Sequence, residues 1–548
     1  MREPVITPPQ PEKVTRTFTR LAPWMLGSRL VVMASGIVVT MILTRTLSTS
    51  EWNSYSLLKN MWTYVFLLGQ LGLVEAALRF VAELSVWGDA GGIKRLIGKI
   101  LSFQTGAVII FLVGFILLRG WLETTFNSPF GFALVVMVLL GGISIVKETL
   151  RQTYTALYRV KLVAFLCFAG ALLFPVAAYV FIPVFQWGVS GGLAAEATDY
   201  VLTIVVLAAL LPRLRLSRSA ALAAREEAPR PVSNYRIARY SGAIVANNLM
   251  MLILGPQTTL FLVGYFLSRA VNGAAGVYNL AVMLPRDAMM FLVMAVVPLL
   301  QTMLTRTCEE DRSRLPELLR SYHRFLILML VPIVVAGCLF MDKVLLVLTG
   351  YKEVGIEAGP LAMILLPLNL VYIIVLPISA GLRVVEKVQR LIVPQIISGV
   401  FDIGLMVLFL WVWPTLGSMV VSRYITNIGT AAFMTYLAVR QVGGLYFPVK
   451  FFIKSILSSS VLLLLLPLRW FLWQPVETWS TATFGKPIVG SAALLLLASV
   501  LAVGLLAFSA RLFHLIGPNE IKYFKNARVP GMNILMRLLV RRRYLAAE

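Results

Sequence analysis

Residues 488–509 read IVGSAALLLLASVLAVGLLAFS, a stretch without a single charged side chain. About 20 apolar residues in a helix cross the hydrocarbon core of a bilayer, which is roughly 30 Å thick. Similar runs recur along the whole chain, which has 548 residues, of which 59% are hydrophobic and only 14% are charged. Inside a bilayer only helices and closed barrels satisfy their backbone hydrogen bonds, and these continuous runs lack the alternation of barrel strands. The sequence therefore predicts an all-α polytopic membrane protein.

Runs of this length predict about fourteen transmembrane helices, separated by short basic or polar stretches. Their approximate ranges are 22–44, 54–78, 97–118, 130–147, 162–184, 190–211, 242–267, 274–303, 325–348, 358–381, 391–412, 416–438, 451–472 and 488–509. The first run follows a polar segment and shows no small-residue cleavage site. We interpret it as a retained span and not as a signal peptide.

The positive charge of the chain follows this topology. The net charge is +24, and Lys and Arg gather in alternate loops, by about five to one on the side of the N-terminus. That side includes the loop after the fourth span, with Lys147 and Arg151, and the tail with Arg541, Arg542 and Arg543. Basic loops stay in the cytoplasm, and no single face collects the charge as in a nucleic-acid-binding domain. We therefore predict a multi-pass protein of a bacterial or archaeal plasma membrane, with both termini in the cytoplasm and no nucleic-acid partner.

The first twelve spans divide into two similar halves. Short segments match in order at a drifting offset of about 225 residues, which predicts parallel repeats and a transporter architecture. The matching segments are 52–55 with 275–278, 89–96 with 311–320, 156–160 with 380–384, and 188–196 with 415–423. The first and last of these matches pair Tyr55 with Tyr278 and Glu196 with Arg423.

This repeat defines the predicted domains. They are an N-terminal lobe over 1–211, a cytoplasmic linker over 212–241, a C-terminal lobe over 242–440, and two further spans with a basic tail over 441–548. The linker is rich in Arg, Ala and Pro, and no stretch outside the spans is long enough for a sizeable soluble domain.

Motifs in both halves resemble a known family. They are LTRTL at 43–47, Tyr55, GQLGL at 69–73, ALRFVAE at 77–83, GYFL at 264–267, GVY at 276–278 and LTGY at 348–351. Together they resemble the polysaccharide-biosynthesis membrane proteins. These are oligosaccharide-lipid flippases, O-antigen and lipid II flippases among them, of the multidrug/oligosaccharidyl-lipid/polysaccharide (MOP) exporter superfamily. The resemblance covers the first twelve spans, and an additional pair of spans is common in the flippase branches.

The resemblance implies two lobes of about six helices around a central cavity that opens to each side in turn. It implies a cargo that is made in the cytoplasm and used outside, a polyprenyl-pyrophosphate-linked oligosaccharide, and a protein that is not an enzyme. The expected partners are this lipid-linked glycan, membrane lipids, and the glycosyltransferases or glycan polymerase of the same pathway.

Basic residues inside the spans are the candidate substrate-binding groups: Arg29, Lys59, Arg286 and Arg423. Charged groups inside a membrane are costly and usually line a cavity or pair with an acid. Cations of this kind suit an anionic pyrophosphate, with Arg29 near the cytoplasmic mouth and Arg286 near the midplane. The alternatives are snorkelling for Lys59, and an ion pair of Arg423 with Asp402 or Glu196.

Acidic residues inside the spans are the candidates for coupling transport to an ion. Asp402 lies near the middle of its span, and the resemblance implies a coupling cation there, with Asn247 and Asn248 as additional oxygen ligands. Neutralisation of Asp402 by an Arg is the structural alternative. Glu196 and Asp199 could instead carry protons. We expect no cofactor other than a coupling Na⁺ or H⁺, because the 3 Cys and 2 His residues show no metal-ligand spacing.

Three other functions remain as alternatives. A cation-coupled multidrug antiporter of the same superfamily would fit the spans, but the first span carries Arg29 and no acid, which disfavours a cationic cargo. A membrane glycosyltransferase or polymerase would need a large outer loop or clustered acids, and the chain contains no Asp-x-Asp. A pure scaffold would have no use for costly cations inside the membrane.

Overall fold

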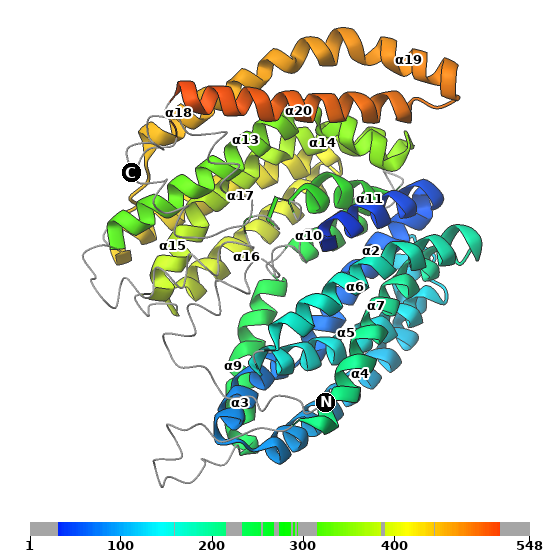
Figure 1. Ribbon diagram of the computed structural model, residues 1–548, viewed down its shortest axis with the longest axis vertical. Helices are drawn as coiled ribbons and strands as arrows, with labels where there is room; N and C mark the ends of the chain where they lie inside the picture. The colour runs from blue at the N-terminus through cyan, green and yellow to red at the C-terminus, as the bar shows by residue number, and fades with distance from the viewer. Residues whose placement is uncertain are drawn as a thin grey trace. The chain divides into compact units, whose positions relative to one another are not determined.

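The computed structural model describes residues 31–157, 159–214, 233–253, 256–267, 273–286, 289–290, 293, 315–384, 389–442, 444–513 and 515 (Figure 1). All regular secondary structure in these residues is helical. Eight helices are long and apolar enough to cross a membrane, and a ninth span results if one bent pair is counted as a single span, in the part of the chain that is described. The protein is thus an all-α, multi-pass membrane protein, and the number fourteen stays a prediction.

The chain forms two compact units, residues 1–265 and 266–548. In the predicted repeat, the span at 242–267 instead belongs to the second lobe. In the structure, α9 (Asn234–Ile253) packs against α2 (Thr49–Gly69) and α3 (Leu73–Trp87) of the first unit. The proposed lobe boundaries therefore stay a prediction.

Unit 1 begins in the described residues with a helix over Val31–Thr46. Its further helices are α2 (Thr49–Gly69), α3 (Leu73–Trp87), α4 (Ala90–Phe126), α5 (Ala133–Ala156), α6 (Val160–Tyr179), η1 (Val180–Val184), α7 (Gly188–Leu210), η2 (Leu211–Arg213), α9, and α10 (Pro256–Leu267), which ends just beyond the unit boundary. The helices α5, α6 and α7 pack closely on one another, and α2 packs on α5 and α7.

The second predicted span is broken rather than continuous. It consists of α2 and α3, which are bent by 43°. Leu71 and Gly72 between them have left-handed backbone, with φ of 51° and 65°. A Cβ atom on Gly72 would lie 2.5 Å from the carbonyl oxygen of Ser241 in α9, so only glycine fits there. The GQLGL motif therefore breaks the helix at a point of close contact with α9.

The helix that contains the fourth predicted span continues past the predicted end of that span. The predicted span ends at 147, with Lys147 and Arg151 in a cytoplasmic loop, but α5 continues to Ala156. Both residues thus lie within the helix. The helix thus continues beyond the predicted end of the span, because a charge that has a partner can be part of a helix, and the cytoplasmic side of these two residues stays a prediction.

Unit 2 contains α11 (Ala274–Tyr278), η3 (Asn279–Met283), α13 (Leu315–Thr349), α14 (Glu353–Leu365), η5 (Leu366–Val371), α15 (Tyr372–Val384), α16 (Gln389–Val412), α17 (Leu416–Leu437), η6 (Ala438–Val442), α18 (Val449–Ser460), η7 (Val461–Leu465), η8 (Leu468–Leu472), α19 (Trp473–Phe484) and α20 (Ile488–Leu512). Its long helix α13 packs against α14, α15, α18 and α20, and α16 packs against α17.

The C-terminal helices are fixed to α13 by polar contacts as well as by apolar packing. Arg469 of η8 donates to Asp342 Oδ2 of α13 at 2.9 Å. Tyr351, just beyond α13, donates to the carboxylate of Glu477 in α19. In Figure 1, α20 runs alongside α19. These helices, which the sequence places outside the repeat, are an integral part of unit 2.

Candidate functional site

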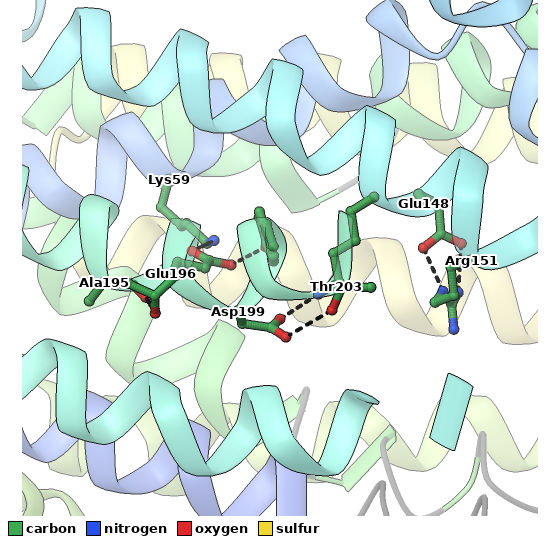
Figure 2. A network of polar contacts seen from close by, with 10 residues as sticks. Lys59, Glu148, Arg151, Ala195, Glu196, Asp199 and Thr203 are labelled. Carbon is green, nitrogen blue, oxygen red and sulfur yellow. Dashed lines mark hydrogen bonds and ion pairs between the residues drawn. The ribbon is translucent and has the colours of Figure 1, made fainter. Parts of the chain in front are cut away.

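A stripe of polar side chains follows one face of α7 in unit 1. Glu196, Asp199, Tyr200 and Thr203 are spaced so that they lie on the same side of the helix, while the rest of α7 is mostly apolar. Figure 2 shows Glu196, Asp199 and Thr203 in a row, with Lys59 near Glu196 and the pair of Glu148 and Arg151 further along. The stripe faces α2 and α5, which carry the basic partners.

Glu196 is the centre of the first cluster. Lys59 of α2 forms an ion pair with its Oε2 atom, and Tyr200 donates to its Oε1 atom at 2.5 Å. The Lys59 ammonium also lies 3.8 Å from the centre of the Trp62 ring. Both carboxylate oxygens of Glu196 are therefore occupied, each by a different partner. Lys59, a predicted substrate-binding residue, binds a predicted proton carrier.

Asp199 is the centre of a second cluster, one turn further along α7. Lys147 of α5 forms an ion pair with its Oδ2 atom, and the same ammonium lies 4.1 Å from the centre of the Tyr200 ring. A Cβ atom on Gly170 of α6 would lie 1.7 Å from Asp199 Oδ1, so the glycine leaves room for the carboxylate. Tyr200 thus contacts both clusters, through its hydroxyl and through its ring.

The row ends in a pair within α5. Arg151 donates from Nε to Glu148 Oε2 at 2.7 Å and from Nη2 to Oε1 at 2.6 Å. Gln152 adds a hydrogen bond to Glu148 Oε1 at 2.7 Å. Such a two-point arginine–carboxylate contact is strong and fixed in geometry. This pair bounds the polar row at the cytoplasmic end that the predicted topology gives to α5.

Unit 2 contains an ion pair of its own between neighbouring helices. Arg423 Nη1 of α17 donates to Asp402 Oδ2 of α16 at 2.7 Å, and its Nη2 donates to the hydroxyl of Tyr278 in α11 at 3.2 Å. The other oxygen of Asp402, Oδ1, is buried without a hydrogen bond to the described residues. Of the two acids that the sequence offered to Arg423, the structure selects Asp402, while Glu196 binds Lys59.

This pairing bears on the predicted coupling ion. A Na⁺ ion at Asp402 would have to compete with a guanidinium that cannot lose its proton. Of Asn247 and Asn248 the structure describes only the helical backbone of α9, so the ligand set proposed for this ion lies partly outside the described residues. In the described chain, no three His, Cys, Asp or Glu side chains come together as around a metal ion. The coupling role of Asp402 stays a prediction.

The two remaining predicted cations have different outcomes. Arg286 is half-buried at the end of the described helical stretch that follows η3, and it takes part in an interaction of its own. Arg29 lies outside the described residues. The structure thus places Lys59, Glu196 and Asp199 in one unit and Arg423 and Asp402 in the other. It adds Lys147 and Tyr200, which the sequence analysis did not propose.

The fold is similar to that of known transporters. A MOP superfamily transporter from Pyrococcus furiosus, described as having a binding pocket of reverse polarity, superposes with a TM-score of 0.54 at 14% identity, over 78% of this chain and 96% of its own. The lipid II flippase MurJ in an inward closed conformation gives a TM-score of 0.60 at 10% identity, over 88% of this chain and 98% of its own. An inward-facing multidrug resistance transporter of the MATE family gives 0.59 at 15% identity, over 77% and 98%.

No protein-family profile and no curated protein matches the sequence. The three solved structures are described as two transporters and a lipid flippase. The chain therefore has the fold of the MOP superfamily transporters. At identities of 10–15% this similarity defines the fold and leaves the cargo open.

Proposed function

We propose that the protein moves a polyprenyl-pyrophosphate-linked oligosaccharide, or a related polysaccharide precursor, from the cytoplasmic to the outer leaflet by alternating access. The observation that carries this choice is the extent of the structural similarity. MurJ covers 88% of this chain, against 77% for the MATE transporter, although each is itself covered to 98%. The C-terminal helices α18, α19 and α20 lie beyond the predicted repeat and are fixed to α13, so the chain is larger than a transporter of twelve spans.

The charges inside the spans also favour an anionic cargo. A pyrophosphate headgroup cannot enter a low-dielectric space without cations to receive it, because burial of an unpaired charge costs many kcal/mol. We propose that Arg29, Lys59, Arg286 and Arg423 serve this purpose. Arginine would bind the headgroup through two hydrogen bonds and lysine as a point charge.

The membrane and the orientation are part of the proposal. The asymmetry of Lys and Arg, about five to one, assigns both termini to the cytoplasm of a bacterial or archaeal cell. The cargo would then come from cytoplasmic glycosyltransferases and be passed to a polymerase or ligase outside. A C-terminal reporter that is active only outside the cell would contradict this orientation.

The second candidate is a cation-coupled multidrug antiporter. The MATE transporter superposes almost as well as MurJ, with TM-scores of 0.59 and 0.60. Against it stands the absence of an acidic residue from the first predicted span, which carries Arg29 instead. The two candidates differ in the sign of the cargo charge, and a binding experiment separates them.

Thermal unfolding of the purified protein in detergent tests the proposal. A short-chain polyprenyl pyrophosphate should raise the melting temperature in a saturable way, because a ligand that binds only the folded state stabilises it. Ethidium, a lipophilic cation, should have no such effect. Arg286→Ala should weaken the response to the pyrophosphate, and Arg286→Lys should restore it in part. Arg119→Ala, at an exposed ion pair with Glu123, should leave it unchanged. Stabilisation by ethidium alone would favour the antiporter.

A further inference from the structure

Each described ion pair that contains a predicted substrate-binding cation also contains a predicted ion-carrying acid. Lys59 binds Glu196 in unit 1, and Arg423 binds Asp402 in unit 2. A cation that is paired with a carboxylate cannot bind a cargo anion as strongly as an unpaired cation would. Binding of the headgroup must therefore compete with the carboxylate for the cation. When the cation leaves, the carboxylate remains as an unpaired charge within the membrane span, which is costly.

The two pairs differ in how firmly the cation is held. The side chain of Lys59 is 29% exposed, and one carboxylate oxygen is its hydrogen-bond acceptor. The side chain of Arg423 is 15% exposed and donates both to Asp402 and to Tyr278. Lysine is a flexible point charge, whereas the arginine fork is fixed by its two partners. Lys59 is therefore the cation that a headgroup can withdraw more readily.

Glu196 is arranged to accept a proton when Lys59 leaves. Its Oε1 atom accepts from Tyr200 and its Oε2 atom binds Lys59. A proton on Oε2 would take the place of the ammonium, while the hydrogen bond from Tyr200 to Oε1 stays in place. The ionisable groups around the two clusters are Tyr55 and Lys59 on α2, Lys147 on α5, and Asp199 and Tyr200 on α7. On α6, Cys167 interacts with Arg151 at the end of the polar row. Lys147 is already bound to Asp199, so it does not replace Lys59.

We propose that Lys59 and Glu196 form an exchange site, at which the anionic headgroup takes Lys59 and Glu196 takes a proton from water. An O–H bond forms at Oε2, the ion pair between Lys59 and Glu196 opens, and the lysine stays protonated as it contacts the phosphate oxygens. Release of the headgroup reverses both steps and returns the proton to water. Cargo binding and proton binding at this site are then positively linked. This inference rests on the proposed function, because it needs an anionic cargo.

Proton uptake on binding of a polyprenyl pyrophosphate tests the inference. The purified protein in weakly buffered, sodium-free detergent solution receives the lipid, and a pH-sensitive dye reports the proton change against protein-free micelles. About one proton should be taken up for each bound molecule, because one carboxylate changes its state. Glu196→Gln should abolish the uptake and tighten binding, because the competing charge is gone. Glu123→Gln, which neutralises an acid outside the proposed machinery in an exposed ion pair with Arg119, is the matched control, and it should retain the uptake.

The outcomes separate the inference from the proposed function. Absence of binding would contradict the function itself. Binding without proton uptake, or uptake that Glu196→Gln preserves, would overturn the exchange site and leave the function standing. Weaker binding by Glu196→Gln would also overturn it. If that variant does not fold, the double variant Lys59→Gln/Glu196→Gln, which leaves no unpaired charge, should bind more weakly than the wild type and take up no proton.

Discussion

The two units place equivalent tyrosines next to charges of opposite sign. In unit 1, Tyr55 of α2 lies near Glu196 of α7, and a Cβ atom on Gly192 of α7 would lie 3.1 Å from the Tyr55 ring. In unit 2, Tyr278 of α11 accepts a hydrogen bond from Arg423 of α17. Tyr55 matches Tyr278 and Glu196 matches Arg423 in the sequence repeat. At these positions of the predicted repeat, the tyrosines are the same and the charges beside them have opposite signs.

The partner of that charge is reversed as well. Glu196 binds a lysine, Lys59, and Arg423 binds an aspartate, Asp402. Lysine changes its pKa readily and moves on a flexible stem, whereas arginine keeps its charge in proteins. The comparison teaches that unit 1 is suited to exchange its ion pair and unit 2 to hold its own.

Removal of Arg423 should have the largest effect on stability. Arg423→Ala leaves Asp402 as a buried charge without its partner, and we expect the free energy of unfolding to fall by about 3–5 kcal/mol. The double variant Arg423→Met/Asp402→Asn should recover most of this loss, because no buried charge remains. Chemical denaturation in detergent measures both variants. If the double variant is as unstable as Arg423→Ala, the loss of stability does not come from the unpaired charge of Asp402.

A methyl group on Gly170 should have an intermediate effect. Gly170→Ala brings a Cβ atom into Asp199, which Lys147 holds in place, and such overpacking costs about 1–3 kcal/mol. The loss should be much smaller in an Asp199→Ala background, where the carboxylate is absent. Gly106→Ala in α4 is the matched control, because its Cβ atom would meet nothing within 4 Å. Equal losses at the two glycines would refute the contact.

The equivalent tyrosines should give the smallest difference. Tyr278→Phe removes a hydrogen bond from Arg423 and should lower the free energy of unfolding by about 0.5–1.5 kcal/mol. Tyr55→Phe should cost less, because the described contacts of Tyr55 are made by its ring, which stacks on Trp52 at 5.6 Å between centroids. The same denaturation measurement applies. A larger loss for Tyr55→Phe than for Tyr278→Phe would reverse the comparison.

The sequence predicted those features that depend on composition and spacing. The apolar runs predicted the helical class, and two acids were proposed for Arg423, of which the structure confirms Asp402. The break at Gly72 was missed, because it follows from a close approach of α9 that lies far away in the sequence. Lys147 was placed in a loop, and its partner Asp199 is on another helix. Nothing in the sequence marked Tyr200 as a site residue, because tyrosine is common in membrane spans. Contacts between helices that lie far apart in the sequence could therefore not be predicted from a single sequence.

Translocation in reconstituted vesicles tests the central claim most directly. A fluorescent polyprenyl-pyrophosphate oligosaccharide is incorporated in both leaflets, and a quencher that cannot cross the membrane is added outside. We predict that vesicles with the protein lose the fluorescence of the inner leaflet with time, and that vesicles with Arg286→Ala retain it, as protein-free vesicles do. An inner-leaflet signal that stays protected while the same vesicles transport ethidium would contradict the account and identify an exporter of cations.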